Sequence, residues 1–242
     1  MKKITLLLFL CISLNMVADQ PIFIKANTAY ANDSITKAIT LYDSILASKK
    51  ESSELYYNLG NCYYKNKDWT NAIWHYEKSL QLTNNEQAKK NLALTKLKII
   101  DRIEALPQLF YKKWWISTQG FLSTKHWQYL AILSIFLALF FEVLNKLLNK
   151  NTKKYYIFFF TSALLLLLIS NSSYQNKIDK KEGIIFSSVV VINSEPTLKS
   201  TELFTLHSGT KLEITNRIGD WIHLKISDGR SGWILQNSIK EL

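Results

Sequence analysis

The segment Glu54–Leu80 reads ELYYNLGNCYYKNKDWTNAIWHYEKSL, and its second half repeats an earlier part of the chain. Thr36–Leu46 is TKAITLYDSIL and Thr70–Leu80 is TNAIWHYEKSL, so the two stretches are related by an offset of 34 residues. Small and aromatic residues coincide at this offset, Ala38 with Ala72 and Tyr42 with Tyr76 as examples. A repeat of this length predicts pairs of antiparallel helices that stack into an α-solenoid.

The slightly longer stretch Glu54–Leu82 resembles a tetratricopeptide repeat. The matching positions carry Tyr56, Leu59, Gly60, Tyr63, Ala72 and Tyr76. Gly60 lies inside a predicted helix, where glycine costs about 1 kcal/mol relative to alanine, so we expect the paired helix to approach closely there. The sequence predicts a repeat domain over residues 19–103, with repeats at 19–52 and 53–86 and a capping helix at 87–103.

The first helix of each predicted pair lines the concave side of such a solenoid. The polar and aromatic residues expected on that side are Asn27, Tyr30, Asn61, Tyr64, Lys65 and Asn91. Asn and Tyr side chains suit hydrogen bonding to an extended peptide, which makes this side a candidate partner-binding groove. The alternative is an ordinary solvated helix face.

Three apolar runs lie outside the repeats. Residues 1–18 have a basic start, a short apolar stretch and a final alanine, which predicts a signal peptide cleaved after Ala18. The alternative is an uncleaved anchor. Residues 127–147 and 155–174 are each long enough to span a bilayer and have aromatic residues near their ends. The link at 148–154 is rich in lysine and has no acidic residue, so it is predicted to be cytoplasmic.

A juxtamembrane linker is expected at 104–126, where aromatic and basic residues suit interfacial anchoring. With a cleaved signal peptide and two spans, both water-soluble parts are predicted on the extracytoplasmic side. Glu142 falls inside the first span, where it either pairs with Lys146 one turn later or takes part in proton or ion movement.

A linker is predicted at 175–183, after which the periodicity changes. Apolar and polar residues alternate in short runs separated by glycines, which predicts four or five strands of a small all-β barrel over 184–242. The stretch 206–234 resembles the bacterial SH3 domain, and the matching residues are Leu206, Gly209, Leu212, Ile214, Gly219, Asp220, Trp221, Asp228, Gly229, Gly232 and Trp233. Trp221 and His223 share one face of a predicted strand and are either a peptide or glycan site or structural aromatics.

The net charge of +11 first suggests nucleic acid, but ten lysines and only three acidic residues lie between 112 and 182, beside the apolar runs. That distribution is typical of a membrane protein, so no nucleic-acid partner is expected.

The two cysteines are Cys11, in the predicted signal peptide, and Cys62, expected to be a packed core thiol. No catalytic motif is found, and we expect no enzyme activity, no catalytic residues, no metal site and no cofactor.

The order signal peptide, repeats, two spans and SH3-like barrel, with DRIEALPQLFYKKWW before the first span, resembles the BatE family of Bacteroides aerotolerance proteins. The resemblance implies a multidomain protein of the bacterial inner membrane whose N- and C-terminal domains are periplasmic. It also implies von Willebrand factor A-type membrane proteins as partners in a complex linked to oxygen or stress tolerance. The expected function is a non-catalytic scaffold, and the alternative is a cell-envelope sensor whose barrel binds peptidoglycan or peptide.

Overall fold

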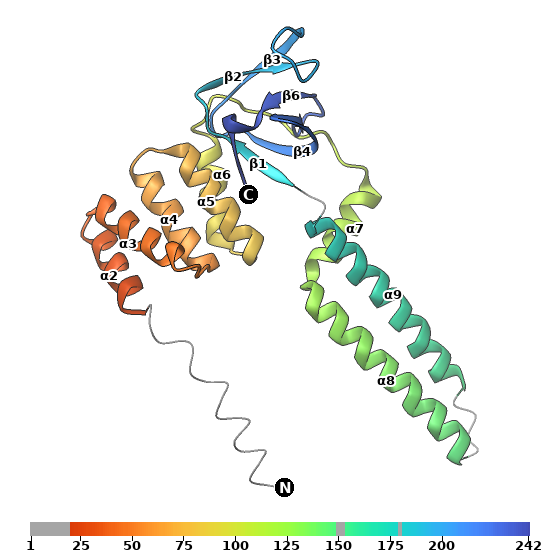
Figure 1. Cartoon of the computed structure of the whole chain (residues 1–242). Coiled ribbons are helices and arrows are strands. Elements are labelled where there is room, and N and C mark those ends of the chain that lie inside the picture. Colours follow the sequence, from red (N-terminus) through yellow and green to blue (C-terminus); the bar gives the residue numbers. More distant parts are fainter. Residues whose placement is uncertain (1–19, 149–152, 179–180) are drawn as a thin grey trace. The chain divides into compact units, whose positions relative to one another are not determined.

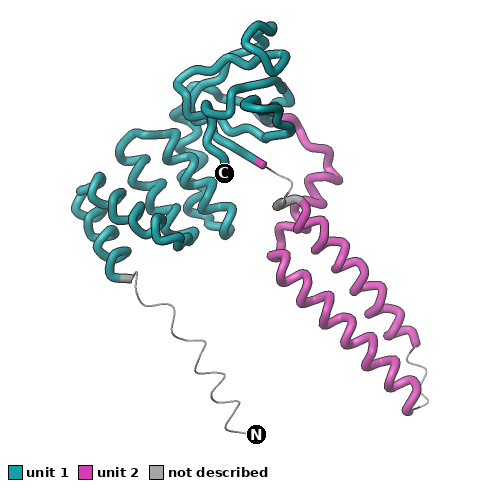
Figure 2. The backbone as a smooth tube through the Cα atoms, viewed as in Figure 1, with its two compact units in different colours: residues 1–104, 182–242 teal, residues 105–181 magenta. Residues whose placement is uncertain are grey.

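The computed structural model describes residues 20–148, 153–178 and 181–242 (Figure 1). The predicted signal peptide at 1–18 and most of the predicted cytoplasmic loop at 148–154 lie outside the described residues. The chain divides into two compact units, the first formed by residues 1–104 together with 182–242 and the second by residues 105–181 (Figure 2). The first unit is therefore built from two segments that flank the second in the sequence.

The N-terminal part of the first unit is helical, and its helices follow the predicted period. They are α2 (Gln20–Ala31), α3 (Ile35–Ala47), α4 (Ser53–Lys65), α5 (Trp69–Leu82) and α6 (Glu86–Lys96). The side chains of Ser52, Asp68 and Asn85 cap α4, α5 and α6 by accepting hydrogen bonds from backbone N–H groups of the first turn. Asp33 and Lys67, 34 residues apart, both have positive φ at the turn within a helix pair, so the two repeats share even their turn geometry.

Gly60 lies where α4 and α5 approach closely. A Cβ atom added there would lie 2.5 Å from the Tyr76 ring. The close approach expected from the sequence is therefore present, and Tyr76 is the residue that faces the glycine. Ala38 and Ala72 are fully buried, as is the Cys62 side chain, and burial raises the pKa of that thiol to about 12.

The capping helix is shorter than the sequence predicts. It ends at Lys96 and does not continue to residue 103. Asp101 accepts hydrogen bonds from the His207 backbone N–H and from the Thr210 hydroxyl, at 2.6 and 2.7 Å. Ile103 packs against the core of the C-terminal sheet. These contacts draw the segment out of the helix and along the sheet.

The second unit contains α7 (Phe110–Phe121), α8 (Thr124–Leu148) and α9 (Lys153–Ile178). The predicted spans at 127–147 and 155–174 lie within α8 and α9, and both helices are long and apolar enough to cross a membrane. They lie side by side and antiparallel (Figure 1), with Phe141 stacked on Phe159 and Ser134 3.2 Å from Ser162. The expected linker at 104–126 contains one further helix, α7, which was not predicted from the sequence.

Within α8, Glu142 lies 3.4 Å from the Lys146 ammonium, which is the pairing expected for the structural alternative.

The C-terminal part of the first unit is an antiparallel sheet. The described residues form seven strands, not the four or five expected: β1 (Glu182–Ile185), β2 (Val189–Asn193), β3 (Glu202–His207), β4 (Lys211–Ile218), β5 (Trp221–Lys225), β6 (Ser231–Leu235) and β7 (Ile239–Glu241). Their order is β3-β2-β6-β5-β4-β1-β7. The short β1 and β7 pair with each other, and their few residues carry too little alternation to be recognised in the sequence.

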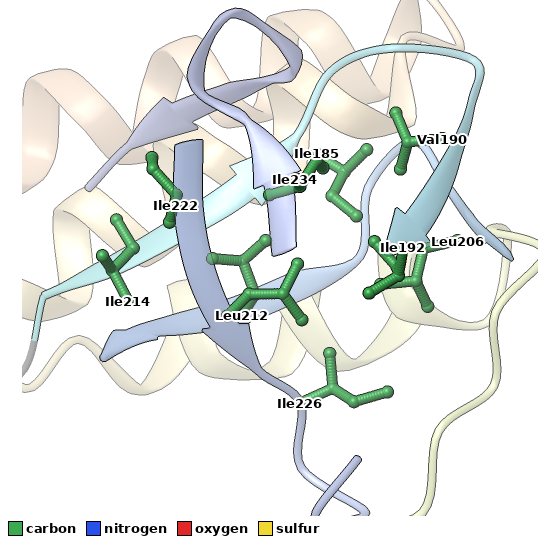
Figure 3. Packing of buried hydrophobic residues seen from close by; sticks show 10 residues of the cluster. Ile185, Val190, Ile192, Leu206, Leu212, Ile214, Ile222, Ile226 and Ile234 are labelled. Atoms are coloured by element: carbon green, nitrogen blue, oxygen red, sulfur yellow. The ribbon is translucent and has the colours of Figure 1, made fainter. Parts of the chain in front are cut away.

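The sheet encloses an aliphatic core. Alternate residues of its strands point inward, Ile222 and Leu224 on β5 for example, and both are fully buried. Figure 3 shows how Ile192, Leu212 and Ile234 from three other strands converge on the same core. This packing leaves the odd-numbered residues of β5, Trp221 and His223 among them, on the opposite face.

Candidate partner-binding surfaces

The asparagines of the predicted groove form a hydrogen-bonded series across the first helices of the repeats. The Asn27 side-chain oxygen accepts bonds from the Tyr42 hydroxyl and the Asn58 amide, at 2.5 and 3.2 Å. The Asn61 oxygen accepts the equivalent bonds from the Tyr76 hydroxyl and the Asn91 amide, at 2.7 and 2.8 Å. The structure therefore ties α2 to α4 and α4 to α6 by the same arrangement one repeat apart.

This arrangement determines what the half-buried asparagines can offer to a ligand. Each of the two oxygens already accepts two hydrogen bonds, which is the capacity of an amide carbonyl. The amide N–H groups of Asn27 and Asn61 make no hydrogen bond to another described residue, and these donors remain for a partner. Their complement is a carbonyl or carboxylate oxygen.

Tyr30, Tyr64 and Lys65 lie at the ends of the same helices. The Lys65 ammonium is 4.6 Å from the centre of the Tyr30 ring and 3.1 Å from Asp33. The hydrogen bond with Asp33 holds the pKa of Lys65 above its usual value, so this side chain is cationic. Tyr64 packs edge-on against Trp69 at 5.2 Å. The two tyrosines thus occupy positions fixed by neighbouring rings and charges.

Trp221 and His223 lie on one face of β5 but take part in different contacts. Trp221 is half-buried and lines a cavity of about 210 Å³ together with Val191, Leu198 and Asn193. The His223 ring lies edge-on to Trp233 at 5.0 Å, and its Nδ1 is 2.6 Å from the Thr215 hydroxyl. The contacts with Trp233 and Thr215 therefore fix the His223 ring within the sheet. Trp221 instead borders the cavity, which is also lined by the exposed Leu198.

The helical repeats and the sheet are joined by a buried carboxylate that is not among the residues predicted from the sequence. Glu77 on α5 lies 2.9 Å from Lys96 on α6 and 2.9 Å from Lys211 on β4. Lys211 also pairs with Glu182 on β1 at 2.7 Å. Burial opposes ionisation of Glu77, but the Lys211 and Lys96 ammonium groups outweigh it and hold the pKa of Glu77 below its usual value.

Apolar contacts complete this junction. Ile184 on β1 is fully buried in the same cluster as Ala72 and Ile73 of the repeats. A Cβ atom at Gly209, which has φ of +89°, would lie 2.6 Å from the Ile99 side chain. The repeats and the sheet therefore share one core.

The C-terminal strand adds two contacts to the same junction. The Trp74 indole N–H donates to the Glu241 carbonyl at 3.0 Å. The Lys240 ammonium lies 3.6 Å from the centre of the Trp74 ring. Strand β7 is thus held against α5 by both a hydrogen bond and a cation–π contact.

Comparisons with known families match the two modules of this unit. Residues 53–83 match the family model described as tetratricopeptide repeat. Residues 188–240 match the model described as bacterial SH3 domain. A search of curated proteins found no match. The chain therefore contains a tetratricopeptide repeat and a bacterial SH3 domain, which are modules that bind proteins or peptidoglycan.

Proposed function

We propose that this protein is a non-catalytic scaffold, anchored in the bacterial inner membrane by α8 and α9, that holds a protein partner on the extracytoplasmic side. The observation that carries the proposal is the shared core of the repeats and the SH3 domain. Ile184, Ala72 and Ile73 belong to one buried cluster, although the segment between them in the sequence contains both apolar helices.

That cluster restricts the topology of a membrane-bound chain. Residues that pack in one core lie on the same side of a bilayer, so the chain between residues 104 and 182 crosses the bilayer an even number of times. A hairpin of α8 and α9 meets this requirement. The lysine-rich link at 148–154 favours a cytoplasmic turn and hence a periplasmic unit. A periplasm-specific reporter enzyme fused after Leu242 is expected to be active, and activity of a cytoplasm-specific reporter there would contradict the orientation.

The proposed partner site is the concave side of the repeats. Free amide donors of Asn27 and Asn61, with the cationic Lys65 at one end, are suited to the oxygen atoms of an extended peptide segment. The resemblance to the BatE family suggests von Willebrand factor A-type membrane proteins as partners, in a complex that contributes to aerotolerance or stress resistance.

Photocrosslinking in native membranes tests this site. A photoreactive amino acid at Tyr64 or Lys65 is expected to give a protein adduct. The matched control is Ser44, an exposed position on α3, the second helix of its pair, which is expected to give none. Equal adducts at both places, or none at Tyr64 and Lys65, would contradict a binding site on the concave side.

A second candidate function is a cell-envelope sensor that binds peptidoglycan or peptide through the SH3 domain. The cavity beside Trp221 favours this alternative, because an aromatic side chain at a hollow is a common contact for glycan and peptide. Sedimentation of the detergent-solubilised full chain with isolated sacculi distinguishes the two. Retention that is lost in Trp221→Ala supports the sensor, and failure of the intact chain to sediment supports the scaffold alone.

A further inference from the structure

Helix α7 is fixed to the hairpin by polar contacts on one of its sides. The Trp115 indole N–H and the Gln119 amide both donate to the Ser172 hydroxyl of α9, at 3.2 and 2.7 Å. The Trp127 indole of α8 donates in turn to the Gln119 carbonyl at 3.4 Å. Trp115 and Gln119 are four residues apart and so lie on the same side of α7, which orients the whole helix relative to α8 and α9.

These contacts lie at one end of the apolar hairpin. Ser172 is near the end of the apolar segment Lys153–Gln175. Its neighbour Ser173 is 3.0 Å from Thr124, which begins α8. Where apolar helices leave a bilayer, the surroundings change from hydrocarbon to lipid headgroups, and tryptophan and tyrosine concentrate at that level. Helix α7 therefore meets the hairpin at the level expected of an interface.

A row of aromatic residues on α7 is left largely uncovered by the described residues. Phe110, Trp114 and Phe121 are spaced by four and seven residues, which places them on one side of a helix. Their exposed fractions are 84, 67 and 81%. Isolated apolar side chains are common on protein surfaces, but three large rings in one row mark a surface that contacts another apolar phase.

The charged residues of α7 complement this row. Lys112 lies on the side opposite Trp114, at about 160° around the helix for 3.6 residues per turn. This is also the side of Gln119, but Lys112 lies seven residues before that contact and its side chain is exposed. Lys113 lies at the border between the two sides. An apolar row with lysines at its border and on the opposite side is the pattern of helices that lie in the plane of a membrane surface, where ammonium groups meet lipid phosphates.

We propose that the row Phe110, Trp114 and Phe121 of α7 inserts into the lipid layer at this end of the hairpin, with Lys113 at the level of the phosphates. The occupant of this surface is the lipid of the bilayer that α8 and α9 cross, and the inference rests on the proposed membrane anchoring. Lipid is chosen because the row belongs to the unit whose α8 and α9 expose apolar side chains along their length, and because the neighbouring lysines are complementary to phosphate.

The test uses the full chain, purified and reconstituted as the sole protein in vesicles of phosphatidylethanolamine and phosphatidylglycerol. Cys11 and Cys62 are first replaced by Ser and Ala, and one new cysteine then carries an environment-sensitive fluorophore. The test position is Trp114→Cys, and the control on the opposite side is Lys112→Cys. Leu133→Cys in the middle of α8 reports separately on the spanning helix. Each sample is quenched with aqueous iodide and with lipids that carry a nitroxide on the acyl chain.

We expect position 114 to show a blue-shifted emission, loss of iodide quenching and strong quenching by nitroxide lipids, and position 112 to show the reverse. If position 133 reports lipid while 114 and 112 both report water, the α7 proposal is overturned and the membrane anchor stands. If 114 is shielded from both quenchers, protein from a second copy covers the row, which also overturns the proposal. If position 133 itself reports water, the proposed anchoring fails as well.

Discussion

The contact between Gly60 and the Tyr76 ring gives the sharpest test of the helix-pair packing. In Gly60→Ala the added Cβ would lie 2.5 and 2.6 Å from two ring carbons, well inside contact distance. The ring is buried and held at its far end, because Tyr76 is 1% exposed and its hydroxyl donates to Asn61 at 2.7 Å. Overpacking of this kind costs about 1–3 kcal/mol, whereas replacing a helical glycine with alanine gains about 0.5–1 kcal/mol. The two ranges combine to a net change of about 0–2.5 kcal/mol, and because the ring is buried and held at its far end we expect a loss in the upper part of that range, roughly 1–2 kcal/mol.

Cys62 supplies an assay on the same helix within the full chain. Its side chain is fully buried, so a thiol reagent reacts only when the repeat domain opens. A loss of about 1–2 kcal/mol raises the population of the open state, and with it the labelling rate, about 5- to 30-fold. The measurement is the rate of Cys62 modification in detergent, with Cys11 replaced by Ser.

A double-mutant cycle separates the steric effect from helix propensity. In a Tyr76→Leu background the ring is absent, so Gly60→Ala is expected to leave the labelling rate unchanged or to lower it. In Tyr76→Phe the ring remains, and the increase caused by Gly60→Ala is expected to persist. Equal effects of Gly60→Ala in all three backgrounds would refute the assignment of the cost to the Tyr76 ring.

Three further predictions concern the first unit. Burial lowers the pKa of His75 to about 4 from an ordinary value of 6.5, so on acidification the unfolded chain takes up the proton before the folded chain does. The free energy of unfolding is therefore expected to fall by about 3 kcal/mol as the pH drops from 6.5 to 4. Urea unfolding midpoints at several pH values measure this, and a midpoint that does not change with pH would contradict it. Lys211→Met deprives the buried Glu77 of one of its two cationic partners. We expect the free energy of unfolding, measured in urea, to fall by about 1–3 kcal/mol. The exposed control Lys225→Met is expected to change it by less than about 0.5 kcal/mol. Asn61→Ala removes the oxygen that accepts hydrogen bonds from the Tyr76 hydroxyl and the Asn91 amide. We expect the free energy of unfolding to fall by about 1–3 kcal/mol and the rate of Cys62 labelling to rise accordingly. An unchanged rate would show that water replaces the lost acceptor.

The elements predicted correctly from the sequence are those that depend on nearby residues. The 34-residue period identifies α2 to α5 because the small and aromatic residues of each pair recur within the repeat itself. Two long apolar helices are found because length and composition suffice to recognise them. Trp221 and His223 are placed on one face by alternation alone, although their separate contacts depend on other strands.

The features that were missed depend on residues far apart in the chain. The capping helix ends early because Asp101 binds residues more than 100 positions away, and no local pattern predicts that contact. The junction carboxylate Glu77 pairs with Lys211 across 134 residues. One local signal was present: Glu77 follows a run of buried residues on α5, and an acidic residue at such a position requires a cation nearby. Helix α7 lies in the segment predicted as a linker, because Pro107 interrupts the helical pattern just before it.

The shared core of the first unit has a consequence for biosynthesis. The repeats leave the ribosome well before residues 182–242, so the side chains of Ile73 and Ile99 that contact Ile184 and Gly209 stay uncovered while α8 and α9 are being made. Under the proposed membrane anchoring, maturation of this unit waits for insertion of the hairpin. A chain whose hairpin inserted with the wrong number of crossings would then keep an uncovered apolar surface, and folding of the unit would depend on the right topology.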